Sequence, residues 1–212
     1  MATLDLQEQE QVEAFKAWWK DNGTWVLLVL TLALGGFAAT KGWHAYKDKQ
    51  ASEAATLFGE LNKQLNSNDP KRINDAAAAV IDKYGSSAYA PRAALLAAQV
   101  NIQSKDVTHA KSQLQWVIDH AGEAALKDVA RLKLASLLLD EKSYAEALAL
   151  LDAAHPESFN GLYADLKGDV LSAQGKTEEA RAAYQQAFEK TDAKSPYHNL
   201  IQIKLDALGG AK

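Results

Sequence analysis

The chain has 212 residues and a formal net charge of −4, and 48% of its residues are hydrophobic although only 8% are aromatic. Ala and Leu, the strongest helix formers, supply most of that hydrophobic fraction, so the composition predicts an all-α protein. The absence of a basic stripe argues against nucleic-acid binding, and the absence of Cys excludes disulfides and thiolate metal sites.

The start of the chain is acidic, because the segment up to Thr40 carries five acids and two bases. We expect an irregular polar leader through about Glu10. Apolar residues then recur at helical spacing at Val12, Phe15, Trp18 and Trp19, and Asn22-Gly23 is a typical helix C-terminal stop. Residues 1–22 are therefore predicted to form a leader that ends in a short amphipathic helix at a membrane surface.

No residue between Asp21 and Lys41 is ionisable. At about 1.5 Å per residue, a helix over residues 23–43 crosses a hydrocarbon core of about 30 Å. Trp25 and Trp43 stand near its two ends, where indole rings favour the headgroup level. A cleaved signal peptide is the alternative, but the preceding region is acidic and too long for a signal n-region. We predict a single helix that anchors the chain in a lipid bilayer.

Gly35, Ala39 and Gly42 lie at i, i+4 and i+7, so they form a strip of small side chains on one face of this helix. Such a strip lets another membrane helix approach closely, which makes it a candidate helix-docking face. Gly and Ala are also common in spanning helices without any docking role.

The lysines that flank the span are weakly asymmetric. Lys16 and Lys20 lie before it, and Lys41, Lys47 and Lys49 lie after it. The positive-inside rule therefore leans towards a cytoplasmic C-terminal domain, although long domains translocate despite such a count.

The remainder of the chain contains an internal repeat in three copies. The aligned positions are Ala98, Val107, Ala110, Leu114 and Val117; Ala135, Tyr144, Ala147, Leu151 and Ala154; and Gly168, Thr177, Ala180, Tyr184 and Ala187. The first copy is separated from the second by slightly more than the second is from the third, which indicates a small insertion. This spacing resembles the tetratricopeptide pattern, in which small residues allow two helices to cross closely. Gly175 occupies the tight-turn position in the last copy, where Lys105 and Lys142 stand in the others.

The expected organisation is a transmembrane helix followed by a tetratricopeptide-like solenoid of helical hairpins. Residues 44–87 form a linker helix and a degenerate first pair, residues 88–194 form three repeats, and residues 195–212 form a capping helix and tail. Helices are predicted at 44–66, 70–84, 88–104, 106–120, 122–141, 143–154, 158–174, 176–190 and 196–208. The first of these helices is expected to continue the spanning helix. In the last, Leu200, Ile203, Leu205 and Leu208 are expected to cap the stack.

The sequence holds no catalytic, cofactor or metal-ligand motif, and its five His residues are scattered. We therefore expect a non-enzymatic protein with a binding surface and no cofactor. The groove positions of the tetratricopeptide family correspond here to Arg92, Leu95, Gln99, Gln103, Leu132, Ser136, Leu139, Leu162, Asp165, Asp169 and Ser172. This mixture suits an extended or unfolded polypeptide, and the same side chains would also suit a solvated surface.

The string from Gln11 to Gly23, followed by the apolar segment, resembles the YfgM-like family of ancillary subunits of the bacterial Sec translocon. The segment from Leu162 to Lys176 resembles the same family. The resemblance implies an inner-membrane anchor with a cytoplasmic N-terminus and a periplasmic repeat domain, opposite to the direction that the lysines favour. It also implies association with the SecYEG channel, with a membrane-anchored periplasmic isomerase-type chaperone and with secreted polypeptides.

From these features we expect an adaptor or chaperone-network component at the translocon. One alternative is a structural scaffold for the assembly of an envelope complex, which would use the same groove for one folded partner. Another is a regulatory repeat protein that faces the cytoplasm.

Overall fold

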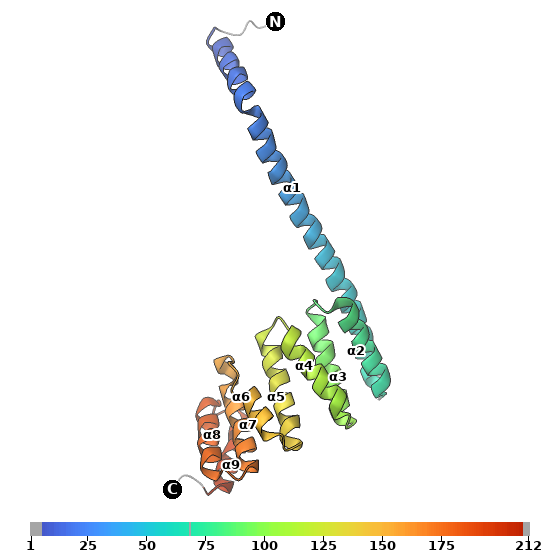
Figure 1. Cartoon of the computed structure of the whole chain (residues 1–212), viewed down its shortest axis with the longest axis vertical. Helices are drawn as coiled ribbons and strands as arrows, with labels where there is room; N and C mark the ends of the chain where they lie inside the picture. The colour runs from blue at the N-terminus through green and yellow to red at the C-terminus, as the bar shows by residue number, and fades with distance from the viewer. Residues whose placement is uncertain (1–5, 68, 210–212) are drawn as a thin grey trace. The chain divides into compact units, whose positions relative to one another are not determined.

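The computed structural model describes residues 6–67 and 69–209, and the elements in these ranges are nine α-helices and two short 3-10 helices (Figure 1). The described residues contain no strand, which confirms the all-α prediction. The chain divides into two compact units, one up to Gln50 and the other from Ala51 onwards.

Helix α1 runs without interruption over Leu6–Gln64. The predicted stop at Asn22-Gly23 is therefore wrong, and residues 6–10 are helical rather than irregular; residues 1–5 lie outside the described ranges. The Asn22 side chain donates a hydrogen bond to the Trp18 carbonyl oxygen (3.1 Å), and a Cβ at Gly23 would lie 3.0 Å from Trp19 Nε1. Gly23 thus leaves room for the Trp19 indole ring against the helix surface. No Pro interrupts the backbone hydrogen bonds of the helix at this point. The expectation that the spanning helix continues beyond residue 44 is confirmed.

The apolar segment of α1 is exposed. Trp25, Leu32 and Leu34 are 69%, 68% and 68% exposed, whereas a core helix of a soluble protein would bury such side chains. Among the described helices, α1 alone is long and apolar enough to cross a membrane.

The second unit consists of helices that follow one another as antiparallel pairs (Figure 1). Their bounds are α2 (Pro70–Tyr84), α3 (Tyr89–Gln103), α4 (Val107–His120), α5 (Ala124–Asp140), α6 (Tyr144–Leu151), α7 (Asn160–Ala173), α8 (Thr177–Lys190) and α9 (Pro196–Ala207), with 3-10 turns η1 at Leu65–Ser67 and η2 at Glu157–Phe159. Most of these helices begin and end within two residues of the predicted limits. Helix α6 ends three residues early at Leu151, ahead of Pro156, whose restricted geometry disfavours a continued helix.

Small residues occupy the crossing points of the helix pairs, as the repeat predicts. Ala98, Ala110, Ala135, Ala147 and Ala180 are fully buried, and Gly168 lies against the ring of Tyr184. Ala98, Ala110, Ala135 and Ala147 belong to one continuous core that runs from α3 to α7, and Ala180 belongs to the neighbouring C-terminal cluster.

The three turns within the repeats share one conformation. Lys105, Lys142 and Gly175 have φ values of 64°, 62° and 76°, which confirms the turn positions read from the sequence. Each turn is closed by the same backbone hydrogen bond, from the residue after the turn to the carbonyl five residues earlier, at Asp106–Asn101, Ser143–Leu138 and Lys176–Leu171. Glycine is favoured in this left-handed region of backbone conformation, so Lys105 and Lys142 adopt it at a conformational cost.

Helix α9 starts as predicted, with the Ser195 hydroxyl accepting from the Tyr197 amide and Pro196 in the first turn. Its buried residues are Ile201 and Leu205, whereas Leu200 and Ile203 are 43% and 64% exposed. The expectation that Leu200 and Ile203 cap the core is therefore wrong. Ile201 and Leu205 lie one turn apart on the face of α9 that packs against α8. Leu200 and Ile203 lie on other faces of the same helix and therefore point outwards.

Candidate functional site: the A-helix cleft

The first helices of successive pairs, α5 and α7, form a cleft with the terminal helix α9. We name this the A-helix cleft; its volume is about 310 Å³ and its lining residues are Leu132, Lys133, Ser136, Leu162, Asp165, Leu166, Asp169 and Tyr197. Five of them, Leu132, Ser136, Leu162, Asp165 and Asp169, are among the groove positions singled out in the sequence.

The repeat explains why these residues meet. Leu132 and Ser136 are one turn apart on α5, and Asp165 and Asp169 occupy the same two repeat positions on α7, in the next copy. Helices α5 and α7 lie in contact, so equivalent faces of successive first helices adjoin.

An ionic cluster closes one wall of the cleft. Lys204 on α9 places its Nζ 2.8 Å from Asp165 Oδ2 and 2.8 Å from Asp169 Oδ1. The hydroxyl of Tyr197 donates to Asp165 Oδ2 (2.8 Å), and the hydroxyl of Tyr184 donates to Asp169 Oδ1 (2.7 Å). Asp165 is only 1% exposed. Both carboxylates are thus held by α8 and α9, so they form part of the wall and are not open recognition groups.

The two tyrosines of this cluster remain donors at neutral pH. Burial raises the pKa of Tyr197 well above its usual range, and the hydrogen bond to Asp165 raises it further. Burial and the hydrogen bond to Asp169 have the same effect on the pKa of Tyr184. A tyrosinate beside these carboxylates would be strongly disfavoured.

The accessible surface of the cleft is mainly aliphatic. Leu162 is 38% exposed, and Leu132 and Leu166 are half-buried. Ser136 is exposed between them, and Lys133 Nζ donates to Gln99 Oε1 on α3 (2.7 Å). The cleft therefore offers apolar side chains with a few hydrogen-bonding groups at their edge.

The other groove positions lie elsewhere. Arg92 forms an ion pair with Glu123 (2.9 Å), and Leu95 and Leu139 pack against the core. Gln103 lines a separate pocket beside Leu65, Pro70, Ile73, Val100 and Ser104. Gln99 reaches the cleft only through Lys133, and Ser172 is half-buried outside it. The groove positions predicted from the family pattern are thus divided among several surfaces of the repeat unit.

The candidate docking strip lies on α1. Gly35, Ala39 and Gly42 are exposed, and a Cβ built at either glycine meets no atom within 4 Å. Backbone at this strip is open to close approach by another helix.

Four residues that shape the cleft are absent from the groove positions taken from the family pattern: Lys133, Leu166, Tyr197 and Lys204. Extending the repeat register into the last helix would have brought Tyr197 close to Asp165, because the next equivalent of Asp165 is His198, the neighbour of Tyr197. Nothing in the sequence signals that Lys204 pairs with two acids of the preceding repeat, Asp165 and Asp169.

Within the described ranges, no three His, Cys, Asp or Glu side chains gather in an arrangement that could hold a metal ion. The chemistry that the cleft itself supplies is noncovalent contact, by apolar surface and hydrogen bonds.

Residues 16–210 match the tetratricopeptide repeat-like domain family. A protein of Neisseria gonorrhoeae named ancillary SecYEG translocon subunit is 33% identical over 207 residues, which cover 96% of this chain and 98% of that protein. Proteins of the same name from Aggregatibacter actinomycetemcomitans and Escherichia coli are 27% and 26% identical, over 96% and 95% of this chain and 98% and 96% of their own lengths. The matches extend through the anchor as well as the repeats. The chain therefore belongs to the tetratricopeptide repeat-like, YfgM-like family of ancillary SecYEG translocon subunits.

Proposed function

We propose that this protein is a membrane-anchored, non-enzymatic adaptor that associates with the SecYEG translocon and holds polypeptide segments in the A-helix cleft. Full-length similarity to relatives named ancillary SecYEG translocon subunits supports the association. The observation that carries the binding role is the gathering of Leu132, Leu162 and Leu166 in one cleft beside Ser136 and Lys133.

The composition of the cleft favours extended segments of varied sequence. Its two carboxylates are paired with Lys204, so the cleft has no unpaired acidic group to select a basic side chain. Aliphatic side chains bind apolar residues with little discrimination, and polar groups at the edge can pair with backbone amides of an extended chain. The ligands we propose are emerging secreted polypeptides and a segment of a membrane-anchored periplasmic isomerase-type chaperone.

Purified full-length protein in nanodiscs should bind a labelled, unfolded secretory precursor. We expect Ser136→Arg and Leu162→Asp each to weaken this binding about tenfold, since each places a charge within the aliphatic surface. Ala182→Arg on the exposed side of α8 is the matched control and should leave binding unchanged. Unchanged binding by both cleft variants, with helix content intact by circular dichroism, would rule out the cleft as the binding site.

We further propose that α1 crosses the inner membrane with the N-terminus in the cytoplasm and the repeats in the periplasm. The lysine count favours the reverse direction, but long domains translocate largely regardless of such counts. The chain contains no Cys, so single cysteines report topology without background. On intact spheroplasts, an impermeant maleimide should label Glu179→Cys and leave Glu13→Cys unlabelled; the opposite pattern would reverse the proposed topology.

A further inference from the structure

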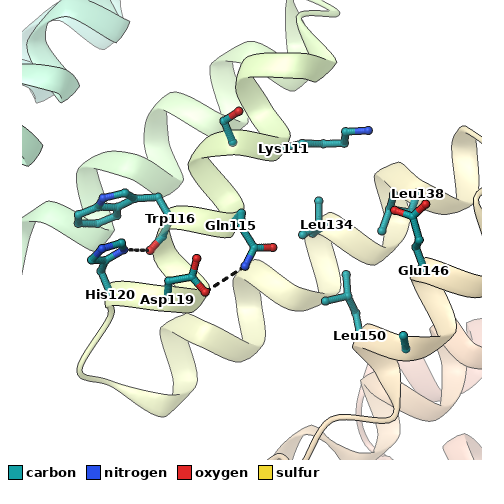
Figure 2. Close-up of a pocket in the computed structure, with 11 residues that line it drawn as sticks. Lys111, Gln115, Trp116, Asp119, His120, Leu134, Leu138, Glu146 and Leu150 are labelled. Atoms are coloured by element: carbon teal, nitrogen blue, oxygen red, sulfur yellow. Dashed lines mark hydrogen bonds between the residues drawn. The ribbon is translucent and has the colours of Figure 1, made fainter.

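The second helices of two neighbouring pairs, α4 and α6, flank a larger hollow that the proposed function does not use. We name it the B-helix groove; its volume is about 760 Å³ and its lining residues are Lys111, Ser112, Gln115, Trp116, Asp119, His120, Leu134, Leu138, Glu146, Ala149 and Leu150. None of them lines the A-helix cleft. Figure 2 shows Leu134 and Leu138 of α5 between the residues of α4 and those of α6.

The floor of the groove is apolar and its aromatic wall is held in place. Leu134 and Leu138 are one turn apart on α5, and Leu150 extends this surface onto α6. Trp116 stacks on His120 with 4.6 Å between ring centroids and 11° between planes. The His120 ring also makes a hydrogen bond to the Trp116 carbonyl oxygen through Nδ1 (2.9 Å; Figure 2), which fixes both rings at the end of α4.

The apolar lining is more extensive between α4 and α6 than between α6 and α8, the next pair of second helices. At the next step, formed by α6, α7 and α8, the positions equivalent to Trp116, Leu134 and Leu150 hold Ala153, Lys167 and Ala183. Lys167 there is paired with Asp152 (2.7 Å). Leu138 recurs as Leu171, whereas the large apolar side chains at the other three positions do not recur. The fold therefore does not require those three, and the additional apolar surface favours a binding role.

The rim of the groove carries an excess of negative charge. Lys111 is paired with Glu141 (2.7 Å), and Asp119 only accepts a hydrogen bond from Gln115 (3.0 Å; Figure 2). Glu146 is exposed and forms no ion pair within the described ranges. Two acids, Asp119 on one wall and Glu146 on the other, thus face the opening without a basic partner in this part of the structure.

We propose that the B-helix groove docks an amphipathic helix of a protein partner, with apolar side chains one turn apart and Lys or Arg on its flanks. Leu134 and Leu138 lie one turn apart along the floor, and Leu150 lies beside them, so the apolar surface matches the apolar face of a helix. A helix satisfies its own backbone, its apolar residues cover Leu134, Leu150 and Trp116, and its bases complement Asp119 and Glu146.

The probe is a fluorescein-labelled helical peptide of about 18 residues with Leu at i, i+4 and i+7 and Lys on the flanks. Its anisotropy is measured with the full-length protein in nanodiscs of zwitterionic lipid. We expect Ala149→Arg, which fills the groove, to weaken binding about tenfold, and Glu146→Lys about fivefold. The matched controls are Ala182→Arg and Glu179→Lys, the equivalent exposed positions on α8, which should bind as the parent does.

A peptide with Glu in place of Lys, and one interrupted by Pro, should bind at least about tenfold more weakly. Ser136→Arg in the A-helix cleft should have no effect on the peptide, so this test is independent of the cleft. The proposal is overturned if the acidic peptide binds equally well or if Ala149→Arg leaves binding unchanged. It is also overturned if sedimentation shows that Ala149→Arg converts a dimer into a monomer, because a second copy would then occupy the groove.

Discussion

Gly168 and Tyr184 illustrate how closely a single helix pair is fitted where α7 and α8 cross. A Cβ at Gly168 would lie 2.5 Å from the Tyr184 ring. In the preceding repeat the same two positions hold Ala135, which is larger than Gly168, and Leu151, which is smaller than Tyr184. The two repeats thus reach the same close crossing with complementary choices of volume.

We predict that Gly168→Ala lowers the free energy of unfolding by about 1–3 kcal/mol, because the crossing point is overpacked. Tyr184→Leu alone loses the hydrogen bond to Asp169, but Gly168→Ala added to it should cost much less than it does beside Tyr184, since the pair then matches Ala135 and Leu151. The measurement is urea unfolding of the full-length protein in detergent for the two single variants and the double variant. Additive effects, with no coupling between the positions, would contradict the steric explanation.

Three tyrosines that are wholly or partly buried make stability sensitive to alkaline pH. Burial, and hydrogen bonds to Asp128, Asp169 and Asp165 respectively, raise the pKa of Tyr163, Tyr184 and Tyr197 above the usual value. A folded-state pKa above the unfolded one means that the native state retains protons which the unfolded chain releases. The stability contributed by these groups is complete below about pH 10 and falls as the pH rises beyond it.

Tyrosinate absorbance should therefore rise in two steps during an alkaline titration. Tyr163, Tyr184 and Tyr197 should ionise last, together with the loss of the near-ultraviolet circular dichroism signal. In the Tyr197→Phe variant the late step should shrink while the early step stays the same. If all seven tyrosines ionised together before any loss of structure, the three hydrogen bonds would not hold in solution.

At the scale of elements, α9 packs against α8 and is tied to α7 by charge. Lys204 is the only base within ion-pair distance of Asp165 and Asp169 in the described residues, and its ammonium also lies 5.5 Å from the centre of the Tyr184 ring. The terminal helix thus closes the core and completes the A-helix cleft through Tyr197.

We predict that Lys204→Met destabilises the protein by about 3 kcal/mol, because it leaves two carboxylates close together without a counter-charge. Adding Asp165→Asn should restore part of the loss. Thermal unfolding in detergent measures both effects, with Lys194→Met on the exposed turn before α9 as the control. A change for Lys204→Met no larger than that of the control would show that the ion pairs do not hold α9.

The elements differ in how far the sequence predicts them. Regular spacing of small residues located the helix pairs, because a crossing point accepts little volume and so constrains the residue type directly. The stop signal at Asn22-Gly23 was misleading, since such local signals are weaker than the apolar and charged helix formers on both sides. The repeat does not predict which face of α9 is buried, because the three aligned copies end at Ala187 and do not include Leu200 or Ile203.

The candidate site was predictable only in part. The repeat register identified five side chains of the A-helix cleft, since equivalent positions of α5 and α7 adjoin. The pairing of Lys204 with Asp165 and Asp169 depends on the packing angle of α9, which no spacing rule supplies. The B-helix groove combines residues from three helices, so it could be found only in three dimensions.

At the scale of the whole molecule, an apolar exposed helix and a unit of helical repeats are parts of one chain. This combination, with the similarity to translocon subunits along the full length, supports the proposal of an adaptor that keeps a polypeptide-binding surface next to the translocon. The A-helix cleft would meet translocating chains, and the B-helix groove would dock a helix of another protein. The two surfaces are formed by different helices of the pairs, apart from their shared helix α5, and so can be tested separately.

The most direct test of this account is photo-crosslinking in intact membranes from a probe at Ser136, with secretory precursors stalled in the translocon. The account predicts crosslinks to several unrelated precursors from Ser136 and none from the control position Ala182. The absence of a crosslink to any precursor, whether or not another protein is crosslinked from Ser136, would contradict the proposal that the cleft holds translocating chains.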